Sequence, residues 1–212
     1  MVMTSMARTE RAALCDLALQ LGEDQPTLSG DWTVKDLVVH LLIREGSPAS
    51  IGITVPQLAK VTEIASQRLA KRDFAVLVEH LRSGPPLYSP LRVPKLDKML
   101  NTIEYFIHHE DIRRAQPSWE PRVLSAREES TLWKPLRHLS KALIRSAEGG
   151  VVIERSDNGH RTRLKSGEPT VVVRGLPSEL ALYLYGRQEQ ARVDRDGADA
   201  ATAALDESDL GI

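Results

Sequence analysis

The sequence predicts an α+β protein in two parts, a helical bundle over residues 1–148 and a small α+β domain over residues 149–212. Up to residue 147 the apolar residues recur at helical spacing, and no segment there is a convincing strand. From Gly149-Gly150 onward, short runs of β-branched residues bounded by turn residues replace that spacing. At 212 residues the chain is long enough to bury a sizeable core.

Helices are expected over residues 4–22, 34–45, 56–84, about 95–115 and 125–147, the last opened by a Ser125/Glu128 capping box. Gly22 is a typical stop signal, and Thr33 with Asp36 three residues later resembles a capping box. Asp73 could divide the third stretch, and Pro135 predicts a kink or a break in the last. The proline-rich segment SGPPLYSPLRVP is expected to be a long connection across the bundle.

The C-terminal part is predicted to be a small sheet with helices. VVIERSD and HRTRLK flank the turn dipeptide Asn158-Gly159, a pattern typical of a β-hairpin. PTVVVRG predicts a third strand and ARVDRDG a fourth. Helices are expected from Pro177 and over residues 198–208.

Composition excludes several classes of partner. With 28 Lys+Arg against 29 Asp+Glu and 4% aromatic residues, no broad basic surface or base-stacking platform is expected, so nucleic acid is not a predicted partner. No window approaches the roughly 18 apolar residues of a membrane span, and MVMTSMARTER lacks the long apolar stretch of a secretory signal. The only cysteine, Cys15, cannot form an intramolecular disulfide and lies in an apolar helical pattern, which favours a buried side chain and a cytoplasmic location. No pattern indicates the oligomeric state.

The segment NTIEYFIHHEDIRRA, residues 101–115, concentrates groups that can carry chemistry. On a helix, Glu104, His108 and Asp111 form one stripe beside the apolar seam, whereas His109 points away. Glu104 and His108, four residues apart, can present ligand atoms to one point. By itself such a pair is a weak signal, because helices also contain it as a surface hydrogen bond. Beside a core seam, however, the pair needs a partner, and a divalent cation is one.

His40 is the best candidate for a third ligand. It lies in DLVVHLLI, a predicted helix that is apolar on nearly every side. The alternative is that His40 donates a hydrogen bond to a backbone carbonyl or caps a neighbouring helix. The spacing of the residues does not decide between the two.

Two of these segments, DWTVKDLVVHLLIRE and IEYFIHHEDIRRAQP, resemble the DinB-like metal-binding proteins, in particular the actinobacterial branch related to mycothiol-dependent maleylpyruvate isomerase. The tail VVVRGLPSELALYLYGRQEQARVDRDG resembles the small C-terminal domain of that branch. The resemblance implies an N-terminal DinB-like four-helix bundle, with His40, Glu104 and His108 as ligands of a divalent metal, zinc by default. Because such a triad leaves a coordination position open, a catalytic rather than a structural site is expected.

The resemblance further implies a thiol cofactor of the mycothiol type and a small-molecule substrate. A coordinated thiol is deprotonated and nucleophilic at neutral pH, which suits an isomerase or an S-transferase. Two alternatives remain: a non-catalytic metal-binding module for sensing or partner binding, and a bundle whose polar network holds no metal. Asp111 either orients a ligand imidazole or pairs with Arg113 or Arg114. Arg174 and Arg187 are candidate counterparts of an arginine that the isomerase associates with its anionic substrate.

Overall fold

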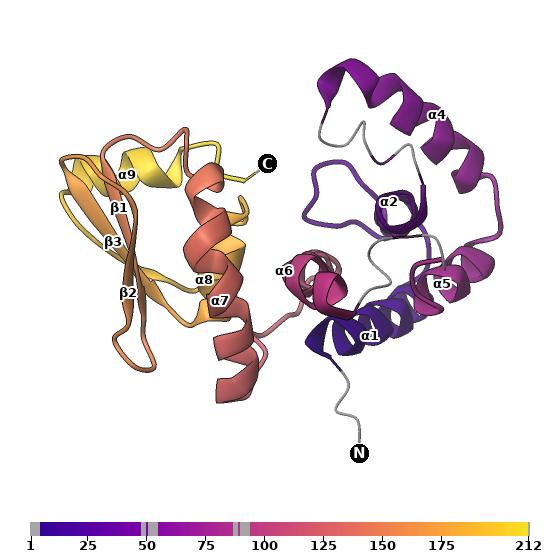
Figure 1. Ribbon diagram of the computed structural model, residues 1–212, viewed down its shortest axis with the longest axis horizontal. Coiled ribbons are helices and arrows are strands. Elements are labelled where there is room, and N and C mark those ends of the chain that lie inside the picture. The colour runs from indigo at the N-terminus through magenta and orange to yellow at the C-terminus, as the bar shows by residue number, and fades with distance from the viewer. Residues whose placement is uncertain (1–4, 48–49, 51–54, 87–88, 90–93, 212) are drawn as a thin grey trace. The chain divides into compact units, whose positions relative to one another are not determined.

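The chain folds into two compact units, Met1–Glu120 and Pro121–Ile212, in a computed structural model (Figure 1). The structure describes residues 5–47, 50, 55–86, 89 and 94–211. Half of the predicted connection SGPPLYSPLRVP, residues 87, 88 and 90–93, lies outside these residues. No helix in the described ranges is both long enough and apolar enough to cross a membrane.

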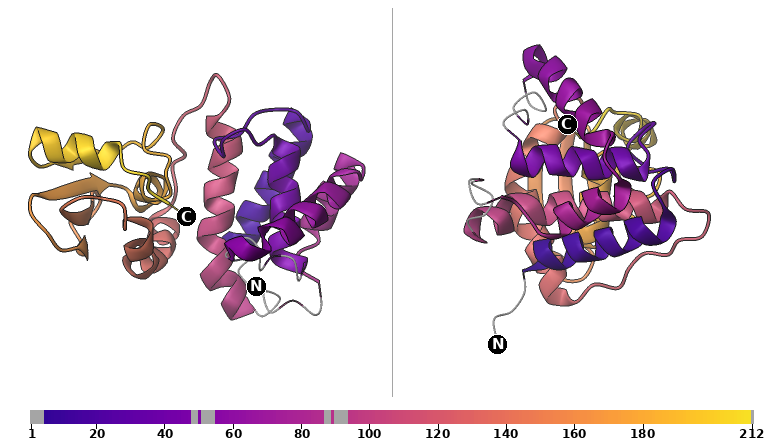
Figure 2. Two further views of the ribbon diagram at one scale, coloured as in Figure 1. Left: turned by 90° about the horizontal axis from the view of Figure 1, so that it is seen from above. Right: turned by 90° about the vertical axis from the view of Figure 1, so that its right-hand side faces the viewer.

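The first unit is helical, as predicted. Its elements are α1 (Met6–Leu21), α2 (Val34–Gly46), the 3-10 turn η2 (Pro56–Leu58), α4 (Ala59–Ala70), α5 (Phe74–Arg82) and α6 (Pro94–Arg114). Helix α1 packs on α6 and α5, and α2 packs on α5 and α4. In the right-hand view of Figure 2, α1, α5 and α2 lie side by side and α4 crosses at an angle to them.

Local signals set the helix boundaries of this unit. Thr33 Oγ1 accepts from the backbone N–H of Asp36, whose carboxylate accepts in return from the Thr33 N–H, so the predicted capping box is confirmed. Asp73 caps α5 through the N–H of Val76 and separates it from α4, also as expected. Helix α1 ends before Gly22, which takes the positive φ of 94° that glycine tolerates best.

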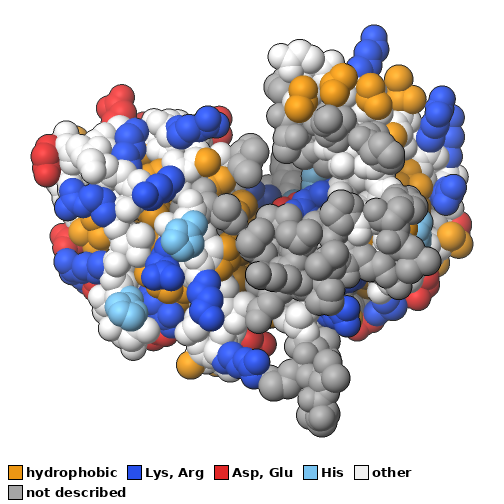
Figure 3. Space-filling view, in the orientation of Figure 1, with side chains coloured by type: hydrophobic (Ala, Val, Ile, Leu, Met, Phe, Trp, Pro, Cys, Tyr) orange, Lys and Arg blue, Asp and Glu red, His pale blue; other side chains and the backbone are white. Residues whose placement is uncertain are grey.

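Apolar side chains from four helices form the core of this unit. Leu14, Cys15 and Ala18 come from α1, Leu37, Val38 and Leu41 from α2, Leu77, Val78 and Leu81 from α5, and Tyr105 and Ile112 from α6. Helix α4 differs, because none of its described side chains is fully buried. Figure 3 shows hydrophobic side chains gathered over this helix, where Val61 and Ile64 are about half exposed at 50% and 46%.

The second unit is a mixed sheet with helices. Its elements are α7 (Ala126–Leu143), β1 (Gly150–Arg155), β2 (Arg161–Lys165), β3 (Thr170–Gly175), α8 (Pro177–Leu184), β4 (Asp194–Asp196) and α9 (Asp199–Asp206). The four strands lie in the order β2-β1-β3-β4, with β1 antiparallel to β2 and parallel to β3, and β3 antiparallel to β4. The predicted α+β class, a helical N-terminal region followed by a small sheet domain, is confirmed.

Helix α7 belongs to the second unit, because it packs on α8 and β2. The contacts therefore divide the chain after Glu120, whereas the change in residue pattern placed the boundary at 148/149. Ser125 and Glu128 form the expected capping box at the start of α7. The helix continues through Pro135, so of the kink or break expected there the break does not occur. Trp133 and Leu136 are buried on either side of this proline, and their packing holds the helix together despite its low propensity.

Candidate metal centre

Three side chains from two helices of the first unit meet at one point. His40 comes from α2, and Glu104 and His108 come from successive turns of α6. Each offers one ligand atom, and the three atoms lie within 4.8 Å of one another. The distance from Glu104 Oε1 is 3.5 Å to His40 Nε2 and 3.4 Å to His108 Nε2. These residues could therefore hold a metal ion.

Two of the spacings between the ligand atoms fit a tetrahedral ion. Bonds of about 2.1 Å to nitrogen and oxygen place neighbouring ligands of a tetrahedron about 3.4 Å apart. The two distances at Glu104 Oε1 match this value, and the imidazole rings of His40 and His108 stand edge to face with centroids 5.4 Å apart. An imidazole pair with one carboxylate is a donor set that suits zinc and other first-row ions.

Asp111 fixes the orientation of His108. Its Oδ2 lies 2.9 Å from His108 Nδ1 and accepts a hydrogen bond of 2.9 Å from the Ser29 hydroxyl. The buried carboxylate favours a proton on Nδ1, which leaves Nε2 to face Glu104. The contact between Asp111 and His108 is thus present, and Arg113 and Arg114 both pair with Glu110.

The electrostatics of the triad reflect the same contacts. Burial by itself would raise the pKa of Glu104, but hydrogen bonds from His108 and His40 and the nearby charge of Arg44 hold that pKa well below its usual range. For His108, burial by itself would lower the pKa, but the contacts with Asp111 and Glu104 outweigh it and raise the pKa to about 9. Without a metal, a protonated His108 therefore lies between the carboxylates of Asp111 and Glu104.

Two neighbours of the triad were not predicted from the sequence. Arg44 lies one turn beyond His40 on α2, and its Nε is 3.1 Å from Glu104 Oε1. The indole of Trp32 lies against the ring of His40, with centroids 4.9 Å apart. Arg44 could have been found, because residues four apart share a helix face. Trp32 precedes the Thr33 cap, and only the geometry of that cap brings it to His40.

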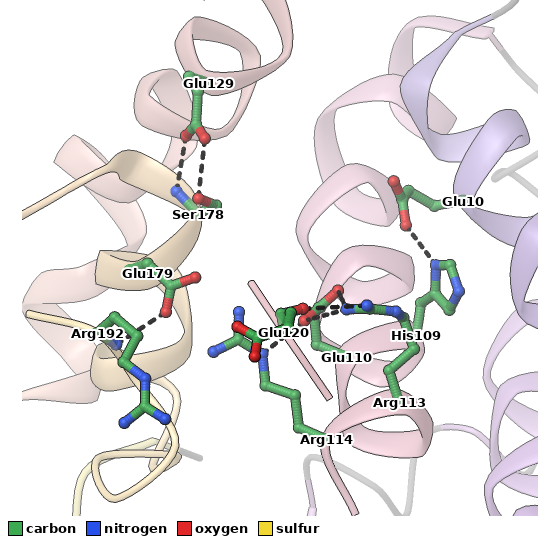
Figure 4. A network of polar contacts seen from close by, with 10 residues as sticks. All are labelled: Glu10, His109, Glu110, Arg113, Arg114, Glu120, Glu129, Ser178, Glu179 and Arg192. Carbon is green, nitrogen blue, oxygen red and sulfur yellow. Dashed lines mark hydrogen bonds and ion pairs between the residues drawn. The ribbon is translucent and has the colours of Figure 1, made fainter. Parts of the chain in front are cut away.

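His109 lies apart from the triad, as the helical geometry predicts. Its Nδ1 is 2.8 Å from Glu10 Oε2 on α1, and both side chains are buried (Figure 4). This pair ties α6 to α1. The remaining histidines, His80, His138 and His160, are exposed.

A cavity of about 410 Å³ adjoins His40 between α2 and α4. Trp32, Val39 and Ile43 line one side of it, and side chains of α4 such as Ser66 and Gln67 line the other. Its volume lies within the range of small-molecule sites. The triad therefore has a space beside it that could admit a small ligand.

Cys15 is not part of this site. It is buried in the core, and its Sγ lies 3.7 Å from the carbonyl oxygen of Val78. Burial raises the pKa of the thiol to about 12, which outweighs the nearby charge of Arg82. The expectation of a buried side chain is confirmed. In the second unit, Arg174 pairs with Glu154 at 2.9 Å, and the Arg187 guanidinium donates to the carbonyl of Tyr185.

Comparison with known proteins identifies the fold. No family model matches the chain, and no curated protein does. Among solved structures, a histidine-to-alanine mutant of the mycothiol-dependent maleylpyruvate isomerase matches with a TM-score of 0.62 and 14% identity, over 92% of this chain and 96% of that one. Another structure of the same isomerase matches with a TM-score of 0.55 and 13% identity over the same shares. The chain thus shares the two-part fold of that isomerase.

Proposed function

We propose that this protein binds a divalent metal ion, zinc by default, through His40, Glu104 and His108, and acts with a low-molecular-weight thiol of the mycothiol type as an isomerase or S-transferase on a small molecule. The observation that carries the proposal is the convergence of the three ligand atoms within 4.8 Å of one another, with both distances from Glu104 Oε1 close to the spacing expected around one tetrahedral ion. The fold shared with a mycothiol-dependent isomerase supports the same reading.

The residues around the triad suit this role. A bound divalent ion would hold a thiol as the nucleophilic thiolate at neutral pH. Asp111 would keep Nε2 of His108 directed at a bound ion, and the cavity that His40 lines could admit a small ligand. Cys15, the chain's only cysteine, is buried with a raised pKa, so the nucleophilic sulfur has to come from outside the protein.

Metal analysis tests the site directly. The wild-type protein and the His108→Ala and Glu104→Gln variants are purified without chelators, and bound metals are measured by mass spectrometry. We expect close to one equivalent in the wild type and a large loss in both variants. His160→Ala is the matched control, because it removes an exposed histidine of the second unit. If His108→Ala holds as much metal as the wild type, the assignment is wrong.

Activity is tested separately on the metal-loaded protein. Mycothiol is supplied with maleylpyruvate and other cis-unsaturated acids, and with electrophiles that a thiol can attack. Isomerisation that requires the thiol supports an isomerase, and consumption of the thiol supports an S-transferase. A full equivalent of metal with no thiol-dependent turnover on any compound would instead support the non-catalytic metal-binding module.

A further inference from the structure

A second cavity of the N-terminal unit, of about 350 Å³, lies at the other end of α2. Its apolar wall includes Leu42 and Ile43 of α2 and Leu69 of α4, and Gly46 and Pro86 also line it. A Cβ on Gly46 would lie 3.1 Å from Pro86 Cδ, so the two residues are closely packed. None of the triad residues lines this cavity.

Three basic side chains line the same cavity. Arg68 lies in the last turn of α4, Arg72 follows four residues later, and His80 lies in the last turn of α5. Across the described part of the chain, none of the three forms an ion pair with a carboxylate. Arg72 lies in the bend just beyond the end of α4, and because Arg68 and Arg72 line the same cavity, one ligand there can contact both residues.

The one carboxylate in the lining does not offset these charges. Oε1 of Glu45 already accepts from Arg11 Nη2 at 2.5 Å and from Asn101 Nδ2 at 3.1 Å. Because Arg11 neutralises Glu45, the cavity keeps the positive charge of the two arginines. A concave site of this sign concentrates anions.

We propose that this cavity is a binding site for a small organic phosphate, separate from the candidate metal centre. Guanidinium groups bind phosphate with paired, charge-assisted hydrogen bonds, and three donor side chains match the three terminal oxygens of a phosphate monoester better than the two of a carboxylate. The cavity is larger than a phosphate group, and its apolar wall suits a ligand with a hydrophobic body.

Titration of the full-length protein with phenyl phosphate, inorganic phosphate and benzoate tests the proposal. Calorimetry should show saturable binding that is tightest for phenyl phosphate. Arg68→Gln and Arg72→Gln should each weaken it by about tenfold, the effect of losing a charge-assisted hydrogen bond. Lys60→Gln is the matched control, because it removes an exposed positive charge from the same helix outside the cavity, and it should leave binding unchanged.

Several results would overturn the proposal. These are the absence of saturable binding, equal affinity for benzoate, and a loss in Lys60→Gln as large as in the arginine variants. The titration is repeated on protein freed of metal with a chelator. Unchanged affinity there supports a separate site, and loss of binding would place the anion at the metal centre instead. Because this readout needs no turnover, it is independent of the proposed function.

Discussion

Binding of Zn²⁺ to this protein is expected to release about one proton at pH 7, because the ion and a proton compete for Nε2 of His108. In the metal-free protein burial lowers the pKa of His108, but Asp111 and Glu104 outweigh it and raise the pKa to about 9. At pH 7 the ring is therefore protonated in all but about one molecule in a hundred. The pKa of Glu104 is held well below its usual range, so its carboxylate contributes no proton in this interval.

The pKa of about 9 for His108 also gives the size of the effect of pH on the affinity for Zn²⁺. Since pH 7 lies about two units below the pKa of His108, proton competition weakens the apparent affinity for Zn²⁺ by about a hundredfold there. The affinity should rise about tenfold per pH unit between pH 6.5 and 8.5. The affinity rises with pH because the pKa of His108 is raised in the folded protein. Below that pKa a proton occupies the imidazole and competes with the metal.

Two measurements together check this expectation. Calorimetric titration in buffers of different ionisation enthalpy gives the number of protons released, and competition with a coloured chelator gives the affinity at each pH. An affinity that does not change between pH 6.5 and 8.5, with no proton released, would refute the assignment of His108 Nε2 as a ligand. Zinc binding by His108→Ala with an unchanged pH dependence would refute it as well.

Three further predictions concern positioning and stability. Above pH 9, where proton competition at His108 is small, Asp111→Asn should lower the affinity for Zn²⁺ by roughly tenfold, because the neutral amide supports the His108 imidazole less well, and chelator competition measures it. Leu81→Ala should lower the free energy of unfolding by about 2–5 kcal/mol in urea denaturation, because Leu81 is fully buried, whereas Leu19→Ala at an exposed site should have little effect. Ser125→Ala should destabilise the second unit by about 1 kcal/mol in the same assay through loss of the α7 cap, and an unchanged midpoint would contradict that role.

Helix boundaries could be predicted because their causes are local. Thr33, Asp73 and Ser125 cap the helices that follow them, and a sequence of three or four residues contains the whole signal. The path of α7 through Pro135 could not be predicted, because it depends on the burial of Trp133 and Leu136 in the folded chain. The parallel pairing of β1 with β3 likewise depends on how the chain returns after the hairpin.

The candidate site was predictable to different degrees. Glu104 and His108 share a helix face, so their separation of four residues was enough to select them. His40 approaches them only because α2 and α6 are neighbours in space. The spacing of residues along the chain does not show that proximity, which was expected from the resemblance to a known family. The roles of Asp111 and Arg44 required side-chain geometry, since each had more than one partner available.

The order of strands in the second unit has a consequence for the behaviour of the protein at high concentration. Strands β2 and β4 form the two edges of the sheet, where backbone groups are available to pair with a strand of another molecule. Arg161, Arg163 and Lys165 occupy alternate positions of β2, and Asp194, Arg195 and Asp196 make up the whole of β4. A second copy adding to either edge would have to desolvate these charges. Short, charged edges therefore protect the sheet from growing into aggregates.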